Sequence, residues 1–537
     1  SGSRGAEGQN LGLYARGGNN RQILITLDGM PINDPSQPAS DFDLRLLDLS
    51  SIESIEVIKG PSSVVYGSGA ATAVIAITTK KTSDRGLTIS LTGSAGTQRG
   101  SSDSPGLDRI QNTIALRSQS LFFEMGQHYS GGMSALRGTT EPDAFDRKHA
   151  GLGGSFTLAR TKVSATARLN EFSAGFDNTY PLEDADFISL SKQLTVTLAS
   201  ETSFGDRKKL ITNAQYGLSD REIRSNYPVS YGARSFSADA YFTQYTGHLS
   251  YLVGAYLLDQ YTDFESIAQM QSIEPYLNVN YAISDPLSIS AGARFISHSS
   301  FGSDLVYTAG PAYTNSLGSL KAKLFADFSS AFIAPSLAQL FGPFGPNPDL
   351  QPETNTTTSI GLELLGNQNT EYSVQLFSRN ETNRVLYSLV DAATYAYQYQ
   401  NTGSEFGAKG VEVFVSQPLR DNLQSSLSYI FTQLDTEGVL RLPKHKLNLL
   451  LSYDLAKGSS IHANYHWVSS RLDTDFSTFE TRSLDPYGLF DLTFSKKLSG
   501  KASFGVQLYN VLNTDFTEII GFATRGRNLS LSYRIEL

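Results

Sequence analysis

The sequence predicts an all-β membrane protein: a closed antiparallel barrel of about 22 transmembrane strands, preceded by a small α+β domain. Three observations carry this prediction. From Leu87 to Leu537, segments of about ten residues alternate apolar side chains with small or polar ones. The connections between these segments are alternately short and long. No apolar run approaches the roughly 20 residues of a membrane-spanning helix.

The composition excludes several other classes of protein. The chain has 537 residues, no cysteine, a formal net charge of -9 and 11% aromatic residues. Without cysteine, neither a disulfide framework nor a thiolate metal site is available. The acidic balance disfavours a nucleic-acid partner. The seven histidines are scattered, and no catalytic triad, metal-ligand spacing or phosphate loop is recognisable, so no enzyme is predicted.

The first element is an α+β corner within residues 52–81. Ile55 and Val57 alternate with Glu56, which is typical of a half-buried strand. Pro61 stands where a short helix would begin, and Gly67 where it would end. Small residues over 68–73 then allow a close backbone approach, and residues 74–79 return to strand character.

The barrel prediction is sharpest in the last strand. A polar linker over 82–86 separates the first domain, residues 1 to about 83, from a barrel over residues 84–537. In the last strand the odd positions are predicted to face lipid and the even positions the lumen. The odd set is Leu529, Leu531 and Tyr533, and the even set is Asn528, Ser530 and Ser532.

Short turns on one rim and long loops on the other are typical of an outer-membrane barrel. The short connections are predicted at 160–161, 284–286, 419–421 and 498–501. The long ones are predicted at 131–146, 173–187, 220–234, 329–352 and 469–485.

Two linked motifs resemble one known family. IESIEVIKGPSSVVYGSGAATAVIAI (52–77) and ARGGNNRQILITLDGMPIND (15–34) resemble the plug domain of TonB-dependent outer-membrane receptors. FIAPSLAQLFGPFGPNPDLQPETNTTTSIGLEL (332–364) and YQNTGSEFGAKGVEVFVS (399–416) resemble segments of the same family's barrel. The resemblance covers the whole chain and is nearest to the cobalamin and siderophore receptors. It implies a plug over residues 1–83 inside the barrel over residues 84–537, whose lumen is wide enough to hold it.

The resemblance also implies a function and a location. It predicts a receptor in the outer membrane of a Gram-negative bacterium that imports a scarce solute, cobalamin-like or a ferric siderophore, with energy from the TonB complex. The implied partners are TonB, outer-membrane lipid and lipopolysaccharide, and a surface lipoprotein. Family plugs carry further residues and a TonB box ahead of this point, which are not present in this chain. Because of this, and because the chain ends in Leu537 rather than an aromatic residue, a non-transporting structural or docking subunit is the alternative.

Two plug loops are predicted, by resemblance, to lie beneath the solute: residues 4–11 and 33–40. Their amide, hydroxyl and carboxylate groups suit hydrogen bonding to a polar ligand, and ordinary turn chemistry is the alternative for each residue. The candidates are Glu7, Gln9, Asn10, Asn33, Asp34, Ser36 and Gln37.

Charged residues on or beside the plug strands are predicted to contact the barrel wall: Arg16, Glu53, Glu56 and Lys59. A solvated strand face is the alternative for each of them. As a group they indicate a polar interface, which is easier to shear than an apolar core.

Calcium is a candidate cofactor, because carboxylates cluster in two predicted loops and calcium prefers several flexible oxygen ligands. The candidate ligands are Asp177, Asp184 and Asp186, with Glu183, Asp143 and Asp146 nearby. The alternative is a solvated acidic loop, since no Asp-x-Asp-x-Asp-Gly pattern is present.

An aromatic row and a stiff loop complete the predictions. Tyr395, Tyr397 and Tyr399 share one strand face, which favours an interfacial aromatic belt over a platform for a planar ligand. Residues 342–348, GPFGPNP, are either a rigid hairpin tip or a contact for a ligand or lid protein.

Overall fold

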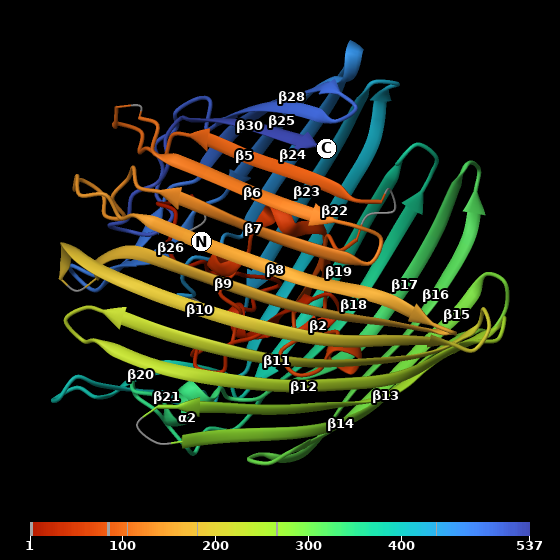
Figure 1. The fold of residues 1–537 in the computed structure, drawn as a ribbon. Coiled ribbons are helices and arrows are strands. Elements are labelled where there is room, and N and C mark those ends of the chain that lie inside the picture. Colours follow the sequence, from red (N-terminus) through yellow and green to blue (C-terminus); the bar gives the residue numbers. More distant parts are fainter. Residues whose placement is uncertain (1–3, 83–85, 105, 180, 265–266, 437) are drawn as a thin grey trace.

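The chain folds into a closed barrel with a small domain inside it (Figure 1). The computed structural model describes residues 4–82, 86–104, 106–179, 181–264, 267–436 and 438–537. Its described strands close a barrel of 22, each antiparallel to its neighbours, which confirms the predicted fold class. Within these ranges, no helix is long and apolar enough to cross a membrane. The predicted domain boundary at residue 83 lies outside the described residues.

The barrel strands follow one another around the wall in chain order, and β30 closes on β5. They are β5 (Thr88–Gly96), β6 (Arg109–Arg117), β7 (Leu121–Ser130), β8 (Phe145–Leu158), β9 (Thr161–Thr179), β10 (Leu182–Ser203), β11 (Lys208–Arg224), β12 (Val229–Tyr245), β13 (Leu249–Asp263), β14 (Ile267–Ala282), β15 (Leu287–His298), β16 (Gly302–Leu317), β17 (Leu320–Ile333), β18 (Glu353–Leu365), β19 (Glu371–Thr382), β22 (Phe406–Arg420), β23 (Leu423–Leu434), β24 (His445–Leu455), β25 (Ser459–Val468), β28 (Tyr487–Ser499), β29 (Ala502–Tyr509) and β30 (Asn528–Glu536). A 3-10 turn, η4 (Ala456–Gly458), joins β24 to β25.

The facing predicted for the last strand is confirmed. In β30 the side chains of Leu529 and Leu531 are 38% and 43% exposed on the outer surface, whereas Asn528 and Ser530 are each 3% exposed. Tyr533 continues the outer row. Because side chains alternate along a strand, a slip of one residue would exchange the two sets.

The loop prediction is partly wrong. Residues 173–187 and 220–234 are mostly strand, because β9 runs on to Thr179 and β10 begins at Leu182. β11 and β12 likewise approach to within a few residues of each other. Cross-strand pairs such as Phe176 with Phe187 extend these hairpins beyond the rim. The turns on the opposite rim are short, as predicted.

Three long connections fold into structure of their own on the long-loop rim. Residues 385–401 form the hairpin β20 (Val385–Asp391) and β21 (Ala396–Asn401). Residues 471–484 form the hairpin β26 (Arg471–Asp475) and β27 (Glu480–Leu484). The connection after β17 holds α2 (Leu337–Phe341), whose first turn is closed by a capping box between Ser336 and Gln339.

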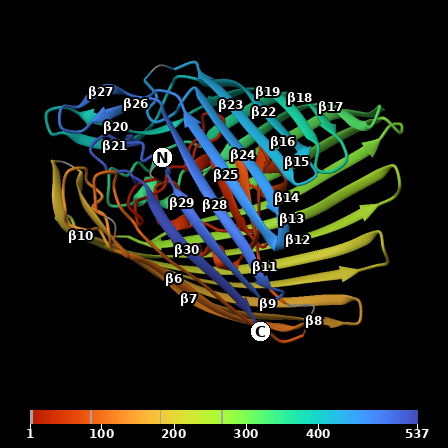
Figure 2. The same cartoon turned by 90° about the horizontal axis from the view of Figure 1, so that it is seen from above.

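The small domain, here called the inner domain (residues 4–82), is surrounded by the barrel wall (Figure 2). Its four-stranded sheet has the order β2-β1-β4-β3, with β1 parallel to β4. Its elements are η1 (Asn20–Gln22), β1 (Ile23–Leu27), β2 (Met30–Pro31), η2 (Leu44–Leu46), η3 (Leu49–Ser51), β3 (Ile52–Lys59), α1 (Ser63–Tyr66) and β4 (Ala73–Thr79). The predicted short helix is therefore α1, ended by Gly67 at φ 92°.

The inner domain shares an apolar core with the wall. Ile25, Phe42 and Ile77 of the inner domain pack in one buried cluster with Phe145 of β8 and Phe172 of β9. The interface is consequently not polar throughout, and this apolar cluster anchors one side of the domain.

Candidate functional site

Asp48 of the inner domain is the centre of a buried ionic contact with the wall. Its carboxylate lies 3.0 Å from His149 Nε2 and 3.4 Å from Arg147 Nη2, both on β8. Gln111 and Thr113 of β6 also donate to it. Burial by itself would raise the pKa of Asp48, but the hydrogen bond and charge of His149 and the charge of Arg147 outweigh it and hold that pKa well below its usual range.

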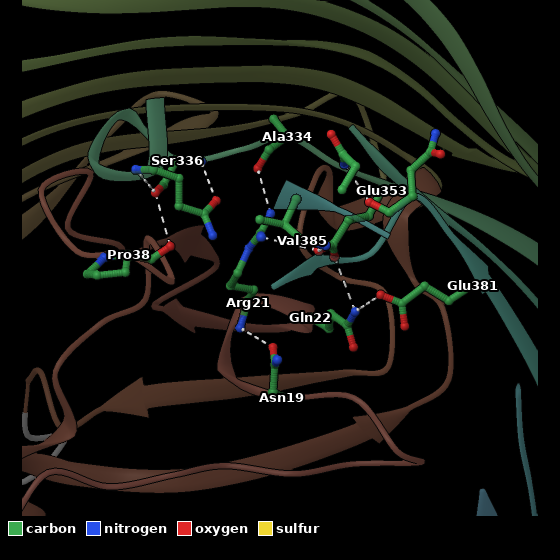
Figure 3. Close-up of polar contacts among 12 residues, drawn as sticks. Asn19, Arg21, Gln22, Pro38, Ala334, Ser336, Glu353, Glu381 and Val385 are labelled. Carbon is green, nitrogen blue, oxygen red and sulfur yellow. Dashed lines mark hydrogen bonds and ion pairs between the residues drawn. The ribbon is translucent and has the colours of Figure 1, made fainter. Parts of the chain in front are cut away.

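A second polar contact joins η1 to β18 and β19 (Figure 3). Arg21 Nη1 lies 3.2 Å from Glu353, and Gln22 Nε2 donates to both Glu353 and Glu381. Arg379 Nη2 in turn donates to Gln22 Oε1 at 2.9 Å and pairs with Glu381. The same view shows Ser336 Oγ donating to the Pro38 carbonyl at 3.0 Å. Gln22, Glu353, Arg379 and Glu381 are all buried, so the inner domain cannot leave without breaking these contacts.

Two of the four predicted wall contacts are confirmed. Arg16 lies 3.0 Å from Glu412 of β22 and stacks over Phe377, and Lys59 lies 3.5 Å from the same carboxylate. Glu53 and Glu56 were predicted wrongly: both side chains are exposed and form no ion pair with any described residue. The reason is topological, because β3 is the edge strand of its sheet and faces solvent along most of its length.

Arg294 of β15 is a wall contact that the sequence prediction missed. Its side chain is 2% exposed and pairs with Glu274 of β14 at 2.7 Å. Its Nε and Nη2 donate to the carbonyls of Val64 and Val65 at 2.9 and 2.8 Å, so a barrel cation caps the last turn of α1. The available signal was an arginine at a lumen-facing position of a strand.

The predicted solute residues of the first loop divide into two kinds. Glu7 lies 2.9 Å from Arg109 and 2.7 Å from His128. Burial would raise the pKa of Glu7, yet the hydrogen bond from His128 and the charge of Arg109 lower it to about 2. Gln9 is half-buried, whereas Asn10 is exposed. Among the described residues, the side-chain oxygen Oδ1 of Asn10 accepts a hydrogen bond only from Leu11 N. Glu7 is therefore a wall contact, and Asn10 remains open to a ligand.

The second loop is more buried than predicted. Asp34 and Ser36 are buried and bonded to each other, and Asp34 lies 3.6 Å from Arg221 of β11. Gln37 also faces Arg221, and Asn33 donates to Ser40 at 3.3 Å. Burial raises the pKa of Asp34, and Arg221 opposes this rise. In the structure Asp34 and Ser36 hold the loop, because they bond to each other and Asp34 also faces Arg221 of the barrel wall.

Three exposed residues lie in or beside the two loops predicted to meet the solute. Asn10 and Tyr14 are exposed, Tyr14 to 38%. They lie in the segment between Glu7, which contacts the wall, and Gly17, which packs against Ala408 of β22. Pro38 is exposed at the tip of the second loop. We call Asn10, Tyr14 and Pro38 the vestibule floor.

The acidic loops gather a different set of carboxylates from that predicted. Oxygens of Glu141, Asp143 and Asp177 lie within 4.8 Å of one another. Asp184 and Asp186 are exposed on β10 and lie outside this group, because the hairpin extends as strand and turns them away. The pKa of Asp143 is raised to about 7, first of all by burial. A hydrogen bond from Ala135 N opposes the rise, and the charges of Asp177 and Glu141 contribute to it.

We propose that calcium takes the place of the proton on Asp143. In the folded protein Asp143 keeps its proton up to about pH 7, whereas in the unfolded chain it loses this proton above pH 3.8. The stability that the proton gives to the folded loop is therefore present at low pH and is lost as the pH rises towards 7. Without calcium, hydrogen exchange of residues 131–144 should accelerate over that window. Added calcium should reverse the acceleration, and Asp143→Asn should abolish the pH dependence. An unchanged pH profile in Asp143→Asn would contradict the assignment.

The tyrosine row does not belong to a membrane belt. Tyr397 and Tyr399 lie on β21, which is not a barrel strand, and their rings lie 5.6 and 4.9 Å from Tyr387 of β20. Tyr395 is 78% exposed at the tip of the hairpin. Residues 342–348 pack on this hairpin through Asn347 Nδ2, which donates to the Tyr399 carbonyl. The loop is therefore the support of a rigid hairpin on the long-loop rim.

The fold and these contacts define a membrane barrel whose lumen is closed by its own N-terminal domain, held by buried ion pairs. The chain belongs to the TonB-dependent receptors: the family model "TonB dependent receptor-like, beta-barrel" matches residues 82–511, and the "TonB-dependent Receptor Plug Domain" model matches residues 1–74. The inner domain is thus the family's plug.

Relatives span nearly the whole chain. The vitamin B12 transporter BtuB of Vibrio cholerae serotype O1 is 24% identical over 99% of this chain and 87% of its own length. Among solved structures, the siderophore receptor PirA of Acinetobacter baumannii superposes with a TM-score of 0.81 at 15% identity, covering 99% of this chain and 94% of its own. The copper transporter OprC gives a TM-score of 0.81 at 16% identity, with coverages of 99% and 93%. At these identities the structural likeness establishes the fold alone.

Proposed function

We propose that this protein is an active-transport receptor of the outer membrane of a Gram-negative bacterium, which binds a scarce solute at its long-loop side and passes it to the periplasm. The TonB complex supplies the energy in this proposal. The observation that carries it is the closed lumen: a 22-stranded barrel filled by a domain that is fixed through buried ion pairs and one apolar cluster. Such a barrel transports only when work is done on the domain inside it.

A compact, largely neutral solute is favoured for the site. The exposed vestibule floor offers an amide at Asn10 and a phenol at Tyr14, while most charged groups around it are already paired within the protein. Amide and aromatic groups suit a ligand that stacks and hydrogen-bonds. A cobalamin-like corrinoid meets this description and agrees with the BtuB relatives, and a ferric siderophore is the next candidate.

Equilibrium binding to the purified protein tests the proposal. We expect labelled cyanocobalamin, or failing that a ferric siderophore, to bind the wild type. Asn10→Ala with Tyr14→Ala should weaken that binding by about 1 to 3 kcal/mol, because these groups lose their partner on the ligand. Glu53→Ala, at an exposed position of the edge strand β3, is the matched control and should bind as the wild type does.

The outcomes separate three cases. If the double variant binds the solute unchanged, the vestibule floor is not the site. If a siderophore binds and cyanocobalamin does not, the corrinoid assignment fails and the transporter proposal stands. If neither class binds the wild type, the reading as a docking subunit on the same fold is favoured instead.

A further inference from the structure

Five charged side chains lie together where η1 of the inner domain meets β18 and β19. Two of them are the carboxylates Glu353 and Glu381, which are 2% and 0% exposed (Figure 3). The other three are guanidiniums. Arg21 of the inner domain pairs with Glu353, Arg379 pairs with Glu381, and Arg384 follows two residues after the end of β19. This five-charge cluster therefore holds one cation more than it holds anions.

Arg384 lies beside both carboxylates and pairs with neither. Register places Phe406 of β22 directly opposite Glu381, and the guanidinium carbon of Arg384 is 4.0 Å from the centre of the Phe406 ring. Arg384 also directly precedes Val385, whose backbone N–H donates to Glu353 Oε1 at 2.6 Å. No ion pair joins Arg384 to any residue that the structure describes. Its long side chain is therefore within reach of both carboxylates while it is bonded to neither.

The two wall arginines hold buried donors that no described residue uses. These donors are Nε and Nη1 of Arg379 and Nε of Arg384. A buried donor without an acceptor costs free energy, and native proteins keep few of them. Both guanidiniums lie over the same ring, that of Phe406, at 6.0 Å for Arg379 and 4.0 Å for Arg384. The wall thus carries three spare donors next to its two buried carboxylates.

The inner domain supplies three hydrogen bonds to these carboxylates. Arg21 Nη1 and Gln22 Nε2 donate to Glu353, and Gln22 Nε2 donates to Glu381 as well. Removing one partner of a buried ion pair normally leaves an uncompensated charge, which is strongly unfavourable. Here the departure of Arg21 leaves two carboxylates with two guanidiniums, and with as many spare donors as bonds lost. The wall side of the contact is therefore balanced once η1 has moved away.

We propose that Arg384, together with Arg379, is the exchange partner of this contact. As the inner domain is drawn away, the two wall arginines turn to Glu353 and Glu381 and replace the donors of η1. Neither carboxylate is then buried without a partner, so the inner domain leaves at a lower cost in free energy. The proposal rests on the transport function proposed above, because transport is what moves the inner domain. Arg384 is a positioning residue of that movement and does not touch the solute.

Hydrogen exchange of residues 19–22 in the purified full chain, without solute, tests the proposal. Arg384→Gln should slow this exchange about threefold to tenfold, because the open state loses a charge-assisted bond that the seated state does not contain. A merely structural role of Arg384 predicts the opposite sign, since the contact would loosen. Arg384→Lys keeps the charge and should exchange as the wild type does. Arg207→Gln, at an exposed short turn, is the matched control and should also leave the exchange unchanged.

A double-variant cycle with Arg21→Met tests the exchange from the other side. In Arg21→Met the wall arginines can still take over Glu353, so exchange of residues 385–389, which begin at the Glu353 contact, should accelerate only slightly. In Arg21→Met with Arg384→Gln it should accelerate by more than the product of the two single effects.

Three results would overturn the proposal: unchanged or faster exchange of residues 19–22 in Arg384→Gln, the same slowing in Arg384→Lys, or independent effects in the cycle. All of these measurements are made on the resting protein, so a failure of the proposed transport function is detected separately, by solute binding and uptake.

Discussion

A disulfide between Ser50→Cys and Thr113→Cys is expected to abolish uptake while leaving solute binding intact. Ser50 lies on η3 of the inner domain, and its hydroxyl is 2.9 Å from that of Thr113 on β6. Two sulfurs at these positions need only approach to about 2.0 Å to bond. The bond would fix the inner domain to the wall, and uptake that requires this domain to move would stop.

The sequence makes this experiment clean, because the chain contains no other cysteine. Thr161→Cys with Thr202→Cys is the matched control: those hydroxyls are also 2.9 Å apart, but both lie on barrel strands, β9 and β10. Uptake of the bound solute by cells should fall to background in the first variant only and return on reduction. Undiminished uptake through the oxidised Ser50–Thr113 variant would show that this part of the domain stays in place during transport.

Asp48→Ala is expected to destabilise the inner domain by about 3 to 5 kcal/mol, the usual loss when one member of a buried ion pair is removed. Arg147 and His149 would be left buried without their carboxylate. Hydrogen exchange of residues 44–51 measures the effect. Glu53→Ala, also in the inner domain but exposed, should change little.

The same carboxylate predicts a pH dependence. Because the pKa of Asp48 is lower in the folded protein than its ordinary value of 3.8, its contribution is complete above that value and is lost as the pH falls below it. Protection of residues 44–51 should therefore decline in acid in the wild type and respond much less in Asp48→Ala. If the wild type and Asp48→Ala were equally protected at neutral pH, Asp48 would not hold the inner domain to the wall.

Much of the fold was open to prediction from the sequence because its signals are local. The alternation in β30 identifies the lumen face from neighbouring residues alone, and the structure confirms it at Leu529, Leu531 and Ser530. The motif over residues 52–77 likewise identified strand, short helix and strand. These features depend on residues a few positions apart.

The site depended on pairings between distant parts of the chain, which only the tertiary structure decided. Arg21 and Glu353 are 332 residues apart, and Asp34 is buried because Arg221 on the wall faces it. The sequence predicted a wall contact at Glu53 and missed the one at Arg294. Glu53 is exposed because its strand lies at a sheet edge, and Arg294 is buried because the inner domain presents carbonyls to it. Composition shows that a residue is charged, whereas its partner and its burial are fixed by how the inner domain sits against the wall.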